Sequence, residues 1–385
     1  MKINRRNFLK TTAITSLYFA GFGIPTFADI KKKKNLIVIM LRGGMDGLCA
    51  VPIKDDKNFE KLRSKINLDR TLPLTSDFDL HPALDVFKRL WDKNLAAVVH
   101  ATNIPYTGRS HFDGQNLMES GGKIPYNVKT GWLGRTMKLA DLTGNGLALA
   151  LPMPLLIRGV PMNDNYYPVR GTLPRKEILN TIQSAFKDYN EKILSETLNS
   201  IQNREGQNYY ASTDNFSLAM SAGKKLSKIN GPKVAVFEVD GFDTHAAQGS
   251  TNGAHADCLN DYDRILQGLK QTMTKQAFDN SLIVTLTEFG RTIQQNSSNG
   301  TEHGYGSAIL LAGGLVKKAQ VHSDWPGLKK KELFEGRDLN STIDARSIYA
   351  SAMSIVFDLE FERIRKEVFW GEKLQNFSDN LFKTT

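Results

Sequence analysis

The feature that most constrains the fold of this chain is a set of five short segments that are apolar almost throughout and are bounded by turn residues. They span 36–41, 96–102, 234–239, 282–287 and 308–312. A strand with one face in water alternates apolar and polar residues, whereas a strand buried on both faces has no need to alternate. The pattern therefore predicts buried strands in a mostly parallel central sheet.

Helical patterns lie between these segments, at 81–93, 257–275 and 344–359. In 257–275, for example, apolar residues recur at three- and four-residue spacing, which gives a helix one apolar face. Alternating strands and helices predict a doubly wound α/β domain with helices on both faces of the sheet. Residues 124–231 are more polar and rich in helical patterns, so we expect a helical insertion or cap there.

The first 28 residues have the features of a twin-arginine signal peptide. Arg5 and Arg6 are followed by Asn-Phe-Leu-Lys, and a mildly apolar run ends at Ala28. The run is short and is interrupted by glycine and proline, which makes it a poor membrane-spanning helix. We therefore expect the twin-arginine translocase to export the folded domain 29–385 to the periplasm or cell envelope. The alternative is an uncleaved segment that remains as an anchor.

Composition places the chain among ordinary soluble globular proteins, with 41% hydrophobic and 23% charged residues. The formal net charge is +10, and four basic residues of the expected signal contribute to it. Basic residues are not interleaved with aromatic ones, so we expect no nucleic-acid partner. Two cysteines, Cys49 and Cys258, are too few for a disulfide-built scaffold. No recognisable pattern indicates whether they pair or how many copies of the chain assemble.

The loops that follow the strands hold most of the candidate functional residues, because ligands bind beyond the carboxyl ends of strands in an open parallel sheet. After the first strand, Asp46 is either a metal ligand or the cap of the next helix. After 234–239, Asp240, Asp243 and His245 place two carboxylates and an imidazole within six residues. This is the densest set of metal-ligating groups in the chain. Their spacing leaves open which aspartate is the ligand.

A second stretch, after 96–102, combines a hydroxyl group with a cation and an imidazole. Ser110 is a candidate nucleophile, Arg109 could hold an anionic group, and His111 could donate a proton. Ser110 is equally suited to begin a helix with Asp113 at its third position. The two roles are compatible, because a nucleophile at a helix N-terminus gains from the helix dipole.

Two further polar stretches follow the segment 282–287. Glu288 and Arg291 come directly after it, and His303 lies further on in a glycine-rich loop. A carboxylate suits a metal ion, a guanidinium suits an oxyanion, and an imidazole among glycines can approach a ligand closely. No one of these loops is specific, but together at strand ends they predict one site.

With these residues assembled, the chain resembles the twin-arginine-exported domain-of-unknown-function family 1501 over nearly its whole length. That family in turn resembles a divergent branch of the alkaline phosphatase and sulfatase superfamily, whose site lies on the sheet and commonly holds two metal ions. The resemblance rests on the arginine signal and on the motifs LRGGMDG (41–47), RSHFD (109–113), GFDTH (241–245), EFGRT (288–292), HG (303–304), WPGL (325–328) and EGRDL (335–339).

The resemblance implies an alkaline-phosphatase-like fold with a nucleophile and a set of metal ligands, assigned by their order along the chain. Ser110 takes the nucleophile position. The implied metal ligands are Asp46, Asp240 or Asp243, His245, Glu288 and His303.

The sequence departs from the superfamily at Phe289, where an imidazole ligand is usual and a phenyl ring cannot bind metal. One site could survive from His245, His303 and one of the two aspartates. The second site keeps only oxygen ligands, which suit calcium or magnesium better than zinc. We therefore expect a divalent metal ion, with zinc, calcium, magnesium and manganese as candidates.

Together the residues predict an exported metal-dependent hydrolase of phosphate or sulfate esters, with an anionic small molecule or glycan ester as substrate. Ser110 or a water would attack, Arg109 or Arg291 would clamp the transferring group, and His111 would protonate the leaving oxygen. The rival hypothesis is a non-catalytic envelope protein, for binding or assembly, that has lost part of the metal site. A third is an envelope protein that acquires its metal or partner before folded export.

Overall fold

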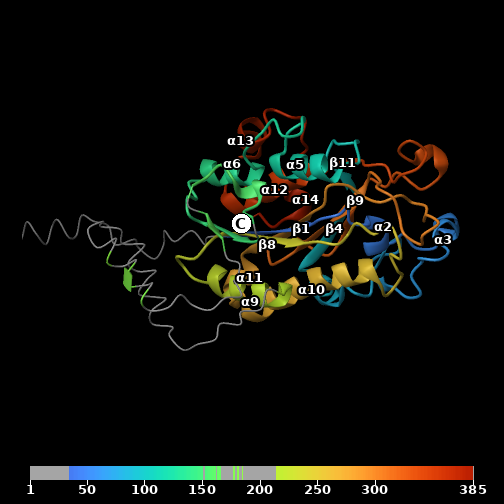
Figure 1. Cartoon of the computed structure of the whole chain (residues 1–385), viewed down its shortest axis with the longest axis horizontal. Helices are drawn as coiled ribbons and strands as arrows, with labels where there is room; N and C mark the ends of the chain where they lie inside the picture. The colour runs from blue at the N-terminus through green and yellow to red at the C-terminus, as the bar shows by residue number, and fades with distance from the viewer. Residues whose placement is uncertain are drawn as a thin grey trace, which may run out of the picture. The chain divides into compact units, whose positions relative to one another are not determined.

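Figure 1 shows the computed structural model of the chain. The structure describes residues 34–150, 152–161, 163–165 and 214–384, together with the single positions 177, 180, 181 and 184. The expected signal peptide 1–28 and most of the stretch 166–213 lie outside the described residues. Among the described helices, none combines the length and the apolarity needed to cross a membrane.

A mixed, mostly parallel sheet forms the centre of the domain. In the described part of the chain it has nine strands, in the order β10 (Val321–His322), β4 (Ala96–Asn103), β9 (Ser307–Ala312), β8 (Ser281–Leu286), β1 (Asn35–Leu41), β7 (Val234–Val239), β5 (Gly146–Leu149) and β6 (Asp164–Asn165), with β11 (Ile343–Asp344) beside β4. A separate pair of short strands is formed by β2 (Leu72–Pro73) and β3 (Asp79–Leu80).

The direction of one strand was not evident from the sequence. β1 runs parallel to both of its neighbours, β7 and β8, which confirms the predicted mostly parallel sheet. β9, however, is antiparallel to both β4 and β8. A strand buried on both faces is apolar throughout in either direction, so its composition does not show which way it runs.

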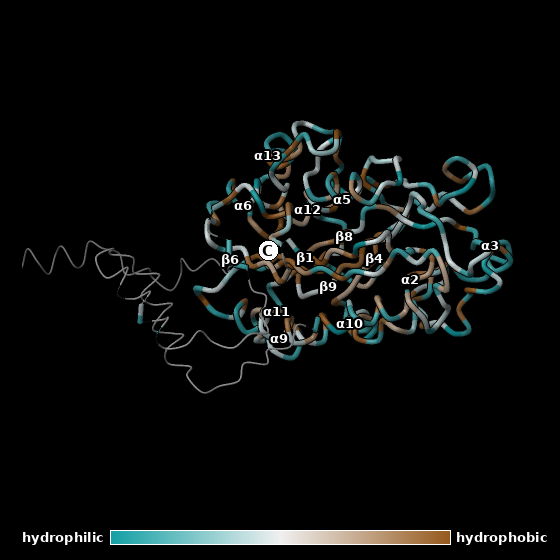
Figure 2. The backbone as a smooth tube through the Cα atoms, in the orientation of Figure 1, coloured by the Kyte–Doolittle hydropathy of each residue, from teal (hydrophilic) through white to brown (hydrophobic). Residues whose placement is uncertain are grey.

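The sheet is buried on both faces, as its apolar composition requires. In β1, Leu36 and Val38 pack into one hydrophobic core, while Ile37 and Ile39 point into the other. Successive side chains of a strand point to opposite faces, so each core receives every second residue. Figure 2 shows mostly hydrophobic strands in the middle of the domain, between helical layers in which hydrophobic and hydrophilic residues mix.

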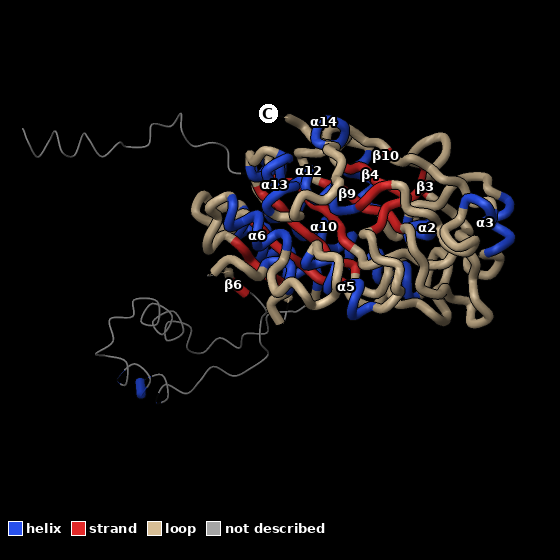
Figure 3. Tube along the Cα trace, turned by 90° about the horizontal axis from the view of Figure 1, so that it is seen from above, coloured by secondary structure: helices blue, strands red, loops and turns tan. Residues whose placement is uncertain are grey.

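Helices cover both faces of the sheet, as predicted (Figures 1 and 3). One layer contains α5 (His111–Ser120), α6 (Trp132–Leu139), α12 (Ala345–Phe357), α13 (Phe361–Glu367) and α14 (Ser378–Leu381). The opposite layer contains α4 (Asp85–Trp91), α9 (Asn215–Leu226), α10 (Ala254–Thr272) and α11 (Lys275–Asp279). Two short helices, α2 (Gly47–Ala50) and α3 (Lys57–Leu62), follow β1. α4, α10 and α12 lie at the three segments predicted to be helical.

The segment 124–231, expected to be an insertion or cap, is part of the main domain where the structure describes it. β5 extends the central sheet beside β7, and α9 packs against α10 in one of the helical layers. This corrects the prediction for those parts. β5 has only four residues, too few to show the pattern of a buried strand, so the segment gave no sign that it adds to the sheet.

Candidate functional site

Segments that are far apart in the sequence meet at one edge of the sheet. β1, β4, β7 and β8 point in the same direction, so the loops after them lie at the same edge. β9 runs the opposite way, so the loop before it reaches that edge as well. This arrangement brings together His111, Asp243, Glu288 and His303, each from a different loop or helix start.

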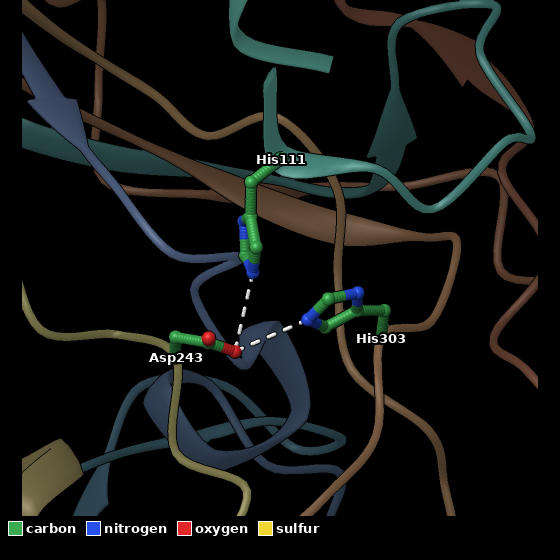
Figure 4. A group of neighbouring side chains, drawn as sticks. All are labelled: His111, Asp243 and His303. Atoms are coloured by element: carbon green, nitrogen blue, oxygen red, sulfur yellow. Dashed lines mark hydrogen bonds and ion pairs between the residues drawn. The ribbon is translucent and has the colours of Figure 1, made fainter. Parts of the chain in front are cut away.

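Asp243 lies at the centre of the site. Its Oδ1 is 3.2 Å from Nε2 of His111, 3.0 Å from Nε2 of His245 and 3.1 Å from Nε2 of His303. Nε2 of His245 and Nε2 of His303 are themselves only 2.9 Å apart. Figure 4 shows His111 and His303 pointing at the Asp243 carboxylate from two different segments.

The other ring nitrogen of each histidine faces an oxygen acceptor. Nδ1 of His111 is 2.8 Å from Oε1 of Glu288, and Nδ1 of His245 is 2.9 Å from Oε2 of Glu302. Nδ1 of His303 is 2.8 Å from the backbone carbonyl oxygen of Arg109. Because carboxylates and carbonyls only accept hydrogen bonds, these contacts assign the proton to Nδ1 in all three rings. The Nε2 lone pairs therefore face the Asp243 oxygen.

The residues present fit a divalent metal ion. Three imidazole lone pairs and a carboxylate oxygen within hydrogen-bonding distance repel one another unless a cation or protons lie among them. Nε2 of His111 is buried and forms no well-aligned hydrogen bond to any described residue. Three nitrogen ligands and one oxygen ligand, with each histidine held by an acceptor behind it, are typical of zinc. His111, Asp243 and His303 alone already form a group able to hold an ion.

Close backbone approach positions the two loops that carry Asp243 and His303. Gly43 has a φ of +113°, and a Cβ atom there would lie 2.4 Å from the backbone nitrogen of Asp243. A side chain at residue 43 would therefore push the Asp243 loop away. The His303 loop is fixed by a β-bridge between Arg291 and His303 and by a hydrogen bond from the Gly304 N–H to the Gly290 carbonyl oxygen.

Arg291 adds a permanent positive charge beside the site. Its Nη1 is 3.1 Å from Oδ1 of Asp243, and its side chain is fully buried. Among the described residues, its Nε and Nη2 have no hydrogen-bond partner. Burial acts to raise the pKa of Asp243, but the Arg291 guanidinium and the neighbouring histidines outweigh it and hold the pKa below its usual value. Asp243 is therefore ionised and ready to bind a cation.

Asp46, expected to be a metal ligand, lies in a separate closed cluster. Its two oxygens accept hydrogen bonds of 2.6 and 3.1 Å from the Arg63 guanidinium, and Oδ2 accepts another of 2.7 Å from Gln248. Both charged side chains are buried. Asp46 also caps α2 by accepting from the N–H of Cys49. The structure therefore assigns it the capping alternative, with a guanidinium where a metal ion was expected.

Two further expected ligands have different places in the structure. Oε1 of Glu288 accepts from the Gly43 N–H, from Gln115 and from His111, so Glu288 stands behind a histidine rather than beside Asp243. Its Oε2 is buried without a hydrogen-bond partner among the described residues. Asp240 is exposed, and it is Asp243 that lies among the imidazoles. The geometry thus separates the two aspartates that the sequence left as alternatives.

The stretch around Ser110 confirms the predicted helix start and differs from the sequence interpretation at Arg109 and His111. Ser110 caps α5, with its Oγ 3.5 Å from the N–H of Asp113. Nδ1 of His111 faces Glu288 and its Nε2 lone pair faces Asp243, so His111 has no proton directed at a leaving group. The Arg109 guanidinium is bound by Glu335 and Asp338 and is not available as an anion clamp.

Sequence reasoning missed two residues that support the site. Glu302 holds His245 and is itself held by Asn296 at 2.6 Å. Gln248 is fully buried, and its Oε1 accepts from the hydroxyl groups of Thr244 and Thr301, one in each ligand-bearing loop. An acid directly before His303 was a usable signal for Glu302. Nothing in the sequence marks Gln248, because its partners come from distant segments.

Comparison with known proteins gives one family and several similar folds. Residues 194–359 match the family described as "Protein of unknown function (DUF1501)". The matched range includes Asp243, His245 and His303 but neither His111 nor Asp46. No curated protein matches the chain in sequence.

Several solved structures are similar to this chain at low identity. A sulfatase from Pseudoalteromonas sp. shares 12% identity at a TM-score of 0.39, covering 91% of this chain and 72% of that one. The zinc complex of the C-terminal periplasmic domain of EcEptC from Escherichia coli shares 11% at a TM-score of 0.38, covering 73% of each chain. The phosphonate monoester hydrolase of Agrobacterium radiobacter shares 12% at a TM-score of 0.30, covering 78% and 74%.

Proposed function

We propose that this chain is an exported metal-dependent hydrolase of phosphate or sulfate esters that binds a single zinc ion. His111, Asp243, His245 and His303 would hold the ion. The observation that carries the proposal is the convergence of three Nε2 atoms on Oδ1 of Asp243, while each Nδ1 is held by an acceptor behind it.

The proposal specifies one ion rather than two. Oxygen ligands for a second ion would have to come from Asp46 and Glu288. The oxygens of Asp46 already bind Arg63 and Gln248, and Oε1 of Glu288 accepts three hydrogen bonds. A guanidinium therefore provides the positive charge beside Asp46, and it cannot be exchanged or removed by a chelator.

The chemistry that a bound zinc ion supplies is Lewis-acid stabilisation of the charge on the transferring group. The chain's own residues orient and attack that group. Ser110, at the N-terminus of α5, would attack phosphorus or sulfur; the new bond to Oγ replaces the bond to the leaving oxygen, and the hydroxyl proton ends on the leaving alcohol. Water then cleaves the new ester and restores the serine. The buried charge of Arg291 would favour an oxyanion beside Asp243.

We expect an anionic substrate, either a small molecule or a glycan ester, because the ion and Arg291 would lie together beside Asp243. The carboxylates of Glu288 and Glu302 stand behind the imidazoles and balance this charge. We further propose that the twin-arginine pathway exports the folded chain to the periplasm, because the signal motif suits a protein that binds its ion before transport.

One feature favours a second candidate function, that of a non-catalytic envelope protein for binding or assembly. The Phe289 ring lies 4.9 Å, between centroids, from the rings of both His111 and His303. An apolar ring beside the imidazoles restricts the space for a substrate. In this case the zinc ion would stabilise the loops without turnover.

Elemental analysis of the mature protein, purified without chelator or affinity metal, tests the proposal. We expect one zinc ion per chain in the wild type, and none in His245→Ala or His303→Ala. His322→Ala is the matched control, because His322 is a half-buried histidine that packs against Phe377. It should keep its zinc.

Turnover of aryl phosphates and aryl sulfates then separates the two candidates. Zinc-dependent hydrolysis that is lost in His303→Ala supports the enzyme, whereas bound zinc with no turnover favours the binding protein. A well-folded wild type that takes up no zinc even after incubation with the metal would contradict both.

A further inference from the structure

A short turn beside the site includes the motif EGRDL and has no role in the chemistry described above. Phe334 and Asp338 close the turn with reciprocal backbone hydrogen bonds of 2.9 and 3.0 Å. The Phe334 ring stacks on Tyr305, two residues after His303, at 4.2 Å between centroids. A β-bridge joins Thr292 to Asp338. The turn is therefore packed against the loop that carries His303.

Asp338 is the buried centre of this turn. Its side chain has no exposed surface, and it binds two arginines. Oδ2 lies 2.8 Å from Nη2 of Arg109 and 3.0 Å from Nη2 of Arg337, while Oδ1 lies 2.8 Å from Nε of Arg337. We call Arg109, Glu335, Arg337 and Asp338 the arginine clasp. A buried carboxylate that binds two guanidinium groups fixes the position of both.

Both arginines of the clasp act on His303. Arg337 donates from Nη2 to the backbone carbonyl oxygen of His303 at 2.5 Å. Arg109 accepts from Nδ1 of His303 through its own backbone carbonyl oxygen at 2.8 Å. One contact holds the backbone of His303, and the other sets the orientation and the tautomer of its ring.

The backbone of Arg109 has an uncommon conformation. Its φ is +56°, a left-handed conformation that non-glycine residues rarely adopt. The conformation turns the Arg109 carbonyl toward His303. The far end of the Arg109 side chain is bound by Asp338 inside the protein and by Glu335 at the exposed edge.

From these contacts we infer that Asp338 is a positioning residue for the metal site, acting on His303 through Arg109 and Arg337. The inference rests on the proposed function, because it assigns Asp338 a role in holding a metal ligand. Glu335 is the exposed member of the clasp, at 57% exposure, and among the described residues its carboxylate is paired with Arg109. Its contribution is therefore small.

Zinc affinity is the first measurement, by competition with a chromogenic chelator. In Asp338→Asn, which keeps the size of the side chain and removes its charge, we expect affinity to fall about 10–100-fold, the usual effect of losing a group that supports a ligand. Glu335→Gln is the matched control and should stay within about twofold, as expected for an exposed ion pair. Thermal unfolding of the metal-free proteins verifies that both variants fold.

The tautomer of His303 is the second measurement, read from the imidazole nitrogen signals in ¹⁵N NMR of the metal-free protein. We expect the Nδ1–H form in the wild type and in Glu335→Gln, and a mixture of tautomers in Asp338→Asn. A change confined to overall stability would leave the tautomer unaltered. If Asp338→Asn retains the pure Nδ1–H form, the inference is overturned.

The two measurements also separate this inference from the proposed function. If the wild type binds no zinc but Asp338→Asn still loses the fixed tautomer, the proposed function fails and the positioning role stands. If the wild type binds zinc and Asp338→Asn matches it in affinity and in tautomer, the positioning role fails and the proposed function stands. Should Asp338→Asn not fold, Arg337→Lys provides the same test, because it keeps the charge and loses the paired contacts to Asp338.

Discussion

Asp46 and Asp243 follow neighbouring parallel strands, β1 and β7, and have opposite surroundings. Asp46 is fully buried, and Arg63 and Gln248 bind its oxygens. The side chain of Asp243 is 45% exposed, and its Oδ1 faces three imidazoles and Arg291. The same residue type at the same sheet edge is thus an internal anchor in one case and an open candidate ligand in the other.

The difference lies in how completely other groups occupy each carboxylate. Arg291 contacts Asp243 at Oδ1 and leaves the side chain 45% exposed, whereas Arg63 and Gln248 bind both oxygens of Asp46. Arg63 reaches Asp46 from the end of the short helix α3 and makes paired contacts.

The closed cluster nevertheless serves the open one. Gln248 donates to Asp46 and accepts from Thr244 and Thr301. The cluster around Asp46 therefore also holds the two loops that carry Asp243 and His303.

Breaking the closed cluster should have the largest effect. In Arg63→Met, Asp46 is left buried without its counter-ion, and we expect the free energy of unfolding to fall by about 3–5 kcal/mol. Urea unfolding of the metal-free protein measures this loss. If the variant cannot be purified folded, Arg63→Lys keeps the charge and should lose less.

The double variant Asp46→Asn with Arg63→Met is the control for the closed cluster. It removes both charges, so it should be more stable than Arg63→Met alone. A single variant that loses less than about 1 kcal/mol would show that the pair is not an anchor.

Changing the open carboxylate should mainly affect the metal. In Asp243→Asn we expect zinc affinity to fall more than about 100-fold, beyond the effect of losing a supporting group. The free energy of unfolding without metal should fall less than in Arg63→Met, because Asp243 is half exposed, although the buried Arg291 loses its ion pair. Chelator competition and urea unfolding in EDTA measure the two quantities. Zinc affinity within tenfold of the wild type would place the ion elsewhere.

Acid should lower the free energy of unfolding through the buried residue His100. This histidine is buried, with Nε2 2.9 Å from the carbonyl oxygen of Val51, and burial lowers its pKa to about 4. As the pH falls below 6.5, the unfolded chain takes up the proton first, so stability present above pH 6.5 is lost toward pH 4. We expect a loss of about 2 kcal/mol between pH 6.5 and 5 from this residue.

The control for acid is His100→Gln, compared with the wild type by urea unfolding in EDTA at several pH values. The variant is expected to be less stable at pH 7 but to show a flatter dependence on pH. Equal slopes in the two proteins would mean that other groups cause the acid sensitivity.

The smallest effect on stability is expected at Ser110, which caps α5 directly before His111. Ser110→Ala removes the cap of α5 and should lower the free energy of unfolding by about 0.5–1 kcal/mol. If Ser110 is the nucleophile, hydrolysis should fall more than about 100-fold in the same variant. Ser110→Thr, which keeps the hydroxyl group, should restore the cap. Unchanged turnover in Ser110→Ala would assign the attack to water.

Much of the fold was predictable because burial on both faces is recorded in each strand separately. The segments 36–41 and 234–239 match β1 and β7 closely, and α10 and α12 follow their apolar periodicity. The direction of β9 was not predictable, because it depends on the strand's neighbours rather than on its residues. For the same reason the sequence did not show that β5 joins the sheet.

The candidate site was predictable in part. Asp243, His245 and His303 were named as candidates from their residue types and their place after strands. The place of His111 beside Asp243, and the closure of Asp46 by Arg63, depend on contacts between segments far apart in the sequence. Glu302 was overlooked although it directly precedes His303, and the role of Asp338 depends on arginines that only the folded chain brings to it.

By itself, the sequence determined which segments must be buried and which loops carry groups able to bind a cation, because apolar pattern and residue chemistry are local properties. Only the tertiary structure decided which carboxylate is buried with both oxygens bound and which stays half exposed among imidazoles. That choice depends on which positive or imidazole group comes within about 3 Å of each oxygen, since attraction between charges and their alignment as hydrogen bonds act over such short distances.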